Sequence, residues 1–230
     1  MFLGPYGLPI FILATVLGLA TQAFVKSSYR KNSTQMLPMG LTGAEVARRV
    51  LDSEGLSRVT IELTPGSLSD HYDPRSDVLR LSRDVYHGTH VAAAGVAAHE
   101  AGHAVQHARG FAPAKARMAL VPVANLGSQA GPILIMLGLV LGVGGQFSEL
   151  LLNLGIGLFA AAVVFQFVTL PVEFDASSRA LAALTTTGSI VPGQEVGARQ
   201  VLTAAALTYV AAALVSVLYL LQFVGLSRRN

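Results

Sequence analysis

Four long apolar stretches alternate with charged segments along the chain. Residues 1–25, 118–148, 150–172 and 200–227 contain no Asp, Glu, Lys or Arg. A helix that crosses a bilayer needs about 20 predominantly apolar residues, and each stretch is long enough. The pattern therefore indicates a mainly α integral membrane protein and predicts four transmembrane helices, near residues 6–25, 120–145, 150–171 and 201–224.

The composition supports this class and excludes others. Only 13% of the 230 residues are charged and 52% are hydrophobic, which excludes a disordered or nucleic-acid-binding chain despite the net charge of +3. The chain has no cysteine, so it holds no disulfide and no thiolate metal site. A signal peptide begins with a basic segment, but no basic residue precedes Lys26. We therefore expect the first apolar stretch to remain as a transmembrane helix.

The charged residues divide the chain into five expected segments. These are a first transmembrane helix over 1–25, a polar module over 26–117, two transmembrane helices over 118–172, a loop or helix over 173–200, and a fourth transmembrane helix with a basic tail over 201–230. Basic residues favour cytoplasmic loops, and Lys26 and Arg117 stand at the two ends of the module. We therefore place the module in the cytoplasm and the N-terminus outside. The tail pair Arg228 and Arg229 would then lie outside, against the rule.

The polar module has the pattern of a small α+β unit. It predicts a helix over 42–54, short strands over 58–63 and 77–83, and a long helix over about 90–109. Thr42 and Glu45 form a capping box at the start of the first helix, and Thr89 can cap the second. The two strands alternate apolar and polar residues, and the segment between them is rich in turn formers, which predicts an exposed loop.

The candidate metal-binding and catalytic residues lie in the long helix, where His99, Glu100 and His103 have the spacing H-E-x-x-H. Residues four apart lie on one helix face, so both imidazoles can bind one zinc ion. Glu100 can then act as general base toward a zinc-activated water that attacks a carbonyl. The pentapeptide also arises by chance, and a buried polar network without metal is an alternative. The flanking Ala, Gly and Val residues favour a metal, because unpaired charges in a buried helix are costly.

A zinc hydrolase usually has a third protein ligand, and the candidates follow the third apolar stretch. Pro171 suits a first helical position, which predicts a helix over 172–184. Glu173 and Asp175 point to nearly opposite faces, so they cannot both bind one zinc ion. Arg179 follows Asp175 by four residues and can pair with it, whereas no basic residue follows Glu173 at that spacing. We therefore assign Glu173 as the third ligand.

His107 lies one turn beyond His103 and about 12 Å along the axis from His99. It cannot share one metal ion with both histidines in an intact helix, so we expect it to support the site or to lie at an interface. In a related zinc motif the third histidine would fall at Arg109, which excludes that class.

Three sequence blocks in order resemble the YugP-type family of predicted neutral zinc metallopeptidases of prokaryotic membranes. They are SDHYDPRSDVLRLSRDVYHG, HEAGHAVQH and LPVEFDASSRAL, and the resemblance covers nearly the whole chain. It implies a multi-pass metallopeptidase of the inner or plasma membrane, with zinc as cofactor and peptide or protein substrates. The site residues that it implies are the ligands His99, His103 and Glu173 and the base Glu100.

The chain is more distantly similar to the HtpX-like and CAAX prenyl proteases. Those proteins place an acid four residues beyond the ligand glutamate, where this chain has Ser177, and a serine orients an imidazole less strongly than a carboxylate does. The resemblance also suggests that one strand within 58–83 holds substrate as an added strand; a hairpin that only supports the helix is the alternative. Candidate donors to an oxyanion are His71, Tyr72 and Arg179.

The sequence therefore predicts a membrane-bound zinc metallopeptidase that uses a zinc-activated water and a glutamate base. Its expected architecture is four transmembrane helices with a small α+β zinc module over 26–117. Two alternatives stay open at this point: a zinc hydrolase of non-peptide substrates and a non-catalytic membrane scaffold.

Overall fold

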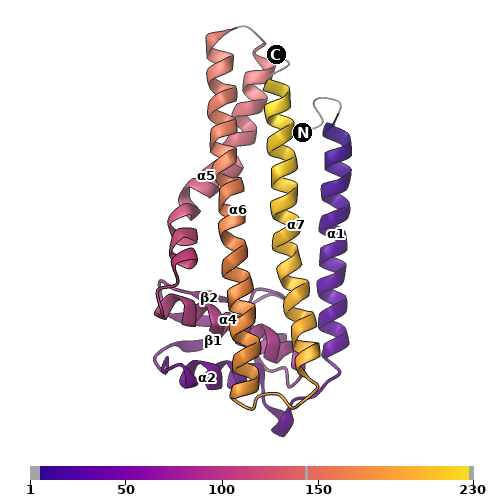
Figure 1. The fold of residues 1–230 in the computed structure, drawn as a ribbon, viewed down its shortest axis with the longest axis vertical. Coiled ribbons are helices and arrows are strands. Elements are labelled where there is room, and N and C mark those ends of the chain that lie inside the picture. Colours follow the sequence, from indigo (N-terminus) through magenta and orange to yellow (C-terminus); the bar gives the residue numbers. More distant parts are fainter. Residues whose placement is uncertain (1–5, 143–144, 228–230) are drawn as a thin grey trace. The chain divides into compact units, whose positions relative to one another are not determined.

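The computed structural model describes residues 6–142 and 145–227, and these form a mainly helical protein with one small sheet (Figure 1). The elements are α1 (Gly7–Asn32), a 3-10 turn (Pro38–Gly40), α2 (Gly43–Ser53), β1 (Thr60–Thr64), β2 (His71–Asp73), β3 (Val78–Ser82), α3 (Arg83–Tyr86), α4 (Val91–Ala108), α5 (Ala112–Val140), α6 (Gln146–Thr186) and α7 (Glu195–Ser227). The predicted fold class, a mainly α membrane protein with a small α+β module, is confirmed.

Four helices in the described part of the chain are long and apolar enough to cross a membrane, namely α1, α5, α6 and α7. They correspond to the four predicted transmembrane segments, and each extends beyond its predicted segment at one end or both: α1 continues to Asn32 and α5 begins at Ala112. Helix α6 continues through Pro171 to Thr186, and α7 begins at Glu195 rather than near residue 201. The prediction that Pro171 starts a separate helix is therefore wrong. Transmembrane helices tolerate an internal proline because neighbouring groups can compensate for the missing backbone hydrogen bond.

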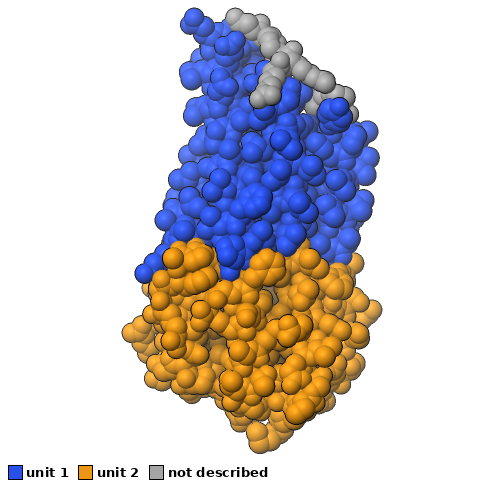
Figure 2. Space-filling model, viewed as in Figure 1, with its two compact units in different colours: residues 1–21, 115–171, 208–230 blue, residues 22–114, 172–207 orange. Residues whose placement is uncertain are grey.

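The chain forms two compact units, coloured separately in Figure 2. Unit 1 consists of residues 1–21, 115–171 and 208–230, and unit 2 of residues 22–114 and 172–207. The described core of unit 1 is a small cluster of apolar side chains that comprises Ile135, Leu152, Tyr219 and Phe223. The division of the chain into five segments that the sequence suggests stays a prediction.

Unit 2 contains a three-stranded sheet with the order β1–β3–β2. Strand β1 pairs with β3 in parallel, with Ile61 opposite Leu79, and β2 pairs with β3 in antiparallel, with Tyr72 opposite Leu79. The sequence predicted two strands and missed β2. Its three residues, His71–Asp73, are too few to show the alternation that marks a strand, and the segment was expected to be an exposed loop.

The helices of unit 2 start where their local sequence dictates, with one correction. Thr42 and Glu45 form the predicted capping box at the start of α2. Helix α4 is capped by His90 rather than by Thr89, because the His90 side chain accepts a hydrogen bond from the Ala93 backbone N–H at 3.1 Å.

Helix α4 lies in the core of unit 2 because one face of it consists of small residues. Ala97, Ala101 and Ala104 are buried there, against α2, the sheet and the unit 2 parts of α6 and α7. A Cβ added at Gly102 would lie 2.9 Å from the Ala176 carbonyl oxygen of α6. Helix α6 can therefore approach α4 more closely than larger residues would permit, which brings the two segments with candidate metal ligands together.

Candidate metal centre

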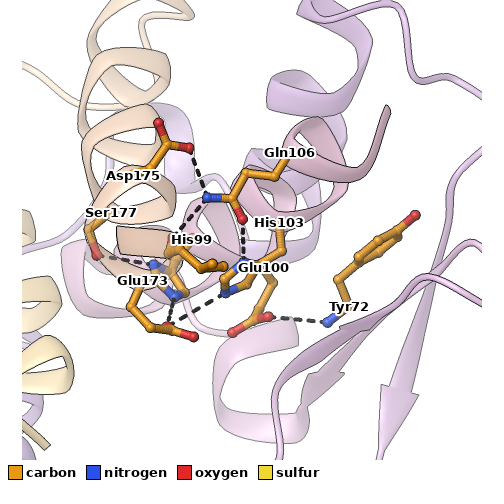
Figure 3. A network of polar contacts seen from close by, with 9 residues as sticks. Tyr72, His99, Glu100, His103, Gln106, Glu173, Asp175 and Ser177 are labelled. Atoms are coloured by element: carbon orange, nitrogen blue, oxygen red, sulfur yellow. Dashed lines mark hydrogen bonds and ion pairs between the residues drawn. The ribbon is translucent and has the colours of Figure 1, made fainter. Parts of the chain in front are cut away.

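Two histidines of α4 and one glutamate of α6 converge on a common point (Figure 3). The Nε2 atoms of His99 and His103 lie 3.3 Å and 3.7 Å from the same carboxylate oxygen of Glu173. Ligand atoms at about 2.0–2.1 Å from a tetrahedral zinc ion are roughly 3.3 Å apart. The spacing of the three side chains therefore fits a zinc ion between them.

The environment of this cluster also favours a cation. Glu173 is almost completely buried, with 2% of its surface exposed, and both imidazoles are largely buried. A buried carboxylate is unfavourable unless it is paired or coordinates a metal. Burial disfavours a charged imidazole, but the hydrogen bond that His103 donates to Glu173 and the charges of Glu100 and Glu173 outweigh it and raise the pKa of His103. The site therefore attracts positive charge.

Gln106 fixes the orientation of His103. Its Oε1 atom lies 2.9 Å from His103 Nδ1, and its Nε2 atom donates to the Val172 carbonyl and to the Asp175 carboxylate, each at 2.8 Å. With a proton on Nδ1, the His103 Nε2 atom carries the lone pair that a metal needs. Sequence reasoning missed Gln106. The available signal was its position three residues after His103, on the same helix face.

His99 is oriented by a weaker contact. Its Nδ1 atom lies 3.3 Å from the Ser177 hydroxyl, at the position where Ser177 was expected to replace an acid. The pairing predicted between Asp175 and Arg179 is present, with 2.6 Å between Arg179 Nε and Asp175 Oδ2. The Arg179 guanidinium also lies over the ring of Phe111. Asp175 thus links Arg179 to Gln106 and takes no place among the three converging side chains.

Glu100 lies beside the metal cluster and faces strand β2. Its Oε2 atom accepts a hydrogen bond from the Tyr72 backbone N–H at 3.2 Å, and Figure 3 shows this contact beside the two histidines. The strand that borders Glu100 is therefore β2, the one that the sequence did not reveal. That a strand of this region holds substrate stays a prediction.

The remaining candidate side chains are engaged away from the cluster. The Tyr72 hydroxyl donates to Asp77 at 2.6 Å and lies 3.0 Å from His107 Nδ1. Burial and the Asp77 carboxylate raise the pKa of the Tyr72 phenol, so it keeps its proton and can accept a hydrogen bond from His107. His71 is exposed and its Nδ1 atom contacts the Ser69 carbonyl. His107 thus supports strand β2 through Tyr72.

The fold and this site define a multi-pass membrane protein with a largely buried cluster of two histidines and one carboxylate that can bind a metal ion. Residues 8–228 match the model of a family described as "Putative neutral zinc metallopeptidase", and the chain belongs to that family. It is similar to the "Putative membrane protease YugP" of Bacillus subtilis (strain 168), with 48% identity over 217 residues and 94% of each chain covered. No solved structure matches the chain. The family confirms the resemblance seen in the motifs and implies zinc as the cofactor.

Proposed function

We propose that this protein is a membrane-bound zinc peptidase in which His99, His103 and Glu173 hold the metal and Glu100 is the general base. The observation that carries the proposal is the convergence of His99 and His103 on one oxygen of Glu173, which follows them by 74 and 70 positions in the sequence. The family match supports the metal and the reaction class. The chain supplies the ligand types that zinc prefers, at a suitable spacing.

The residues around the metal have separate tasks in peptide hydrolysis. Zinc, when bound, supplies Lewis acidity toward a water molecule and the substrate carbonyl. The Glu100 carboxylate takes a proton from the attacking water and delivers it to the leaving nitrogen of the peptide bond. The Tyr72 backbone N–H keeps this carboxylate in place. Gln106 and Ser177 hold the two imidazoles with their Nε2 atoms toward Glu173.

The position of Glu173 suggests where cleavage takes place. The charge-free stretch 150–172 of α6 ends immediately before Glu173, so the metal ligand stands at the membrane exit of this helix. We propose that substrates are peptide segments at the membrane surface, on the cytoplasmic side. The basic residues at both ends of the polar module, Lys26 and Arg117, support that side.

The proposal is tested by replacing the base while the ligands stay intact. Glu100→Gln removes the proton acceptor, so peptide cleavage should fall by roughly 10²–10⁴-fold, whereas zinc content stays that of the wild type. His99→Ala should lose both zinc and cleavage. Glu62→Gln, an exposed site on β1, is the matched control and should leave both unchanged. Cleavage is followed with a fluorogenic peptide library, and zinc by elemental mass spectrometry.

Two outcomes would contradict the proposal. Normal cleavage by Glu100→Gln would show that another group is the base. Turnover of acyl or phosphoester substrates without any peptide cleavage would show that the reaction class is wrong.

A further inference from the structure

Helices α6 and α7 form a groove of about 490 Å³ within unit 2, and its lining includes none of the three converging side chains His99, His103 and Glu173. Its apolar part includes Phe174, Leu202 and Leu207, and its polar part includes Ser177, Arg199 and Thr203. Phe174 and Leu207 remain exposed although they are large and apolar. The groove therefore combines a hydrophobic surface with a cation and hydroxyl groups.

Arg199 is the cation of this groove, and it is available to a ligand. Its side chain is exposed, and among the described residues it has no ion pair. The nearest acid on the same helix, Glu195, also lines the groove. Its carboxylate accepts a hydrogen bond from the Gly193 backbone N–H at 2.7 Å, which holds it at the start of α7. An anionic group in the groove can therefore pair with Arg199.

The two helices place the groove at the depth of lipid headgroups. On α6 the charge-free stretch 150–172 covers roughly 34 Å at 1.5 Å per residue, close to the ~30 Å of a hydrocarbon core, and Phe174 follows directly. On α7 Arg199 precedes Leu207 by about 12 Å. The headgroup region is roughly 5–8 Å thick on each side of the membrane. The long Arg199 side chain can extend over the remainder of the roughly 12 Å, so its guanidinium can reach a lipid headgroup.

We propose that this groove binds an anionic phospholipid, with the phosphate on Arg199 and an acyl chain along Phe174 and Leu207. A lipid suits it better than a soluble anion because Phe174 follows the charge-free stretch 150–172 in the sequence and Leu207 lies within the charge-free stretch 200–227. Ser177 lines the groove, and its hydroxyl also contacts His99. A bound lipid therefore lies one side chain away from a metal ligand.

Native mass spectrometry of the full-length protein in neutral detergent tests the proposal without any assay of catalysis. The probes are phosphatidylglycerol and phosphatidylcholine of equal chain length. The wild type should retain phosphatidylglycerol in preference, and Arg199→Gln should weaken this preference by roughly fivefold or more. Arg199→Lys should keep most of it. Arg75→Gln removes an exposed arginine elsewhere in unit 2 and should behave as the wild type.

Three results would overturn the proposal. They are equal retention of the two lipids by the wild type, an unchanged preference in Arg199→Gln, and displacement of phosphatidylglycerol by inorganic phosphate, which would indicate a site for soluble anions. Zinc content should stay unchanged in every variant, so a failure here is distinct from a failure of the proposed peptidase function.

Discussion

At the scale of single residues, the proposed metal centre includes side chains that hold the imidazoles in place as well as the three proposed ligands. Gln106 is buried and contacts His103, Val172 and Asp175 at once, so it joins the helix with two ligands to the segment with the third. Ser177 makes only one long contact with His99. The two ligand histidines are therefore supported unequally.

Replacement of Gln106 should weaken metal binding directly. Gln106→Ala removes the acceptor for His103 Nδ1 and leaves the buried Val172 carbonyl without its amide donor, so zinc affinity should fall by about 10–100-fold. Competition with a chromophoric chelator measures the affinity. Gln194→Ala, which removes a half-buried amide that donates to the Met36 carbonyl away from the cluster, is the control and should bind zinc as the wild type does. Equal affinity in Gln106→Ala would show that Gln106 has no positioning role.

Local sequence patterns predict some residues of this site and do not identify others. The spacing of His99, Glu100 and His103 within one helix suffices to place them on neighbouring turns. The pairing of Asp175 with Arg179 follows from their i,i+4 spacing and is present. Gln106 lies three residues after His103 on the same helix face, but this spacing alone does not distinguish a glutamine that supports a histidine from any other interior glutamine. Its bonds to Val172 and Asp175 depend on the packing of α4 against α6, which no local rule specifies.

At the scale of elements, the site depends on how closely α4 and α6 approach each other within unit 2. Gly102 faces the Ala176 backbone, where an added Cβ would lie 2.9 Å from the carbonyl oxygen. Gly95, on the same helix, faces Ala198 of α7 with 3.8 Å to the carbonyl oxygen. The first contact leaves no room for a side chain, whereas the second allows a methyl group.

These two glycines give a matched pair of variants. Both Gly102→Ala and Gly95→Ala gain up to about 1 kcal/mol of helix propensity, but only Gly102→Ala must move α6 away from α4. Such overpacking costs typically about 1–3 kcal/mol. We expect Gly102→Ala to lower the thermal midpoint and the zinc affinity, and Gly95→Ala to preserve both. Thermal unfolding with and without zinc measures this, and equal behaviour of the two variants would refute the close-contact explanation.

The elements show the same division between what sequence predicts and what it does not. Apolar length identifies the four long helices, and the capping box identifies the start of α2. Strand β2 could not be predicted because its three residues are too few to show an alternation of apolar and polar positions. Its pairing with β3 also depends on neighbouring strands of the sheet. The continuation of α6 through Pro171 could not be predicted, because a proline usually marks the start of a helix. In a transmembrane helix, neighbouring helices allow a proline in the interior.

At the scale of the whole molecule, the absence of cysteine makes the orientation directly testable. Single cysteines can be introduced at Ser67, in the loop before β2, and at Gln146, at the start of α6, since both positions are exposed. The basic residues around the module predict that Ser67 lies in the cytoplasm and Gln146 outside. In intact cells an impermeant thiol reagent should therefore label Gln146→Cys and spare Ser67→Cys until the membrane is opened. The reverse labelling would show that the protein has the opposite orientation in the membrane.

The central claim is that three residues from two helices form a zinc site, and elemental mass spectrometry of the detergent-purified protein tests it most directly. The wild type, purified without chelator, should contain about one zinc ion per chain, as should Glu100→Gln. His99→Ala, His103→Ala and Glu173→Gln should each lose most of it. A wild-type protein without zinc, even after resupply of the metal, would contradict the account and leave the His99, His103 and Glu173 cluster as a polar contact between helices.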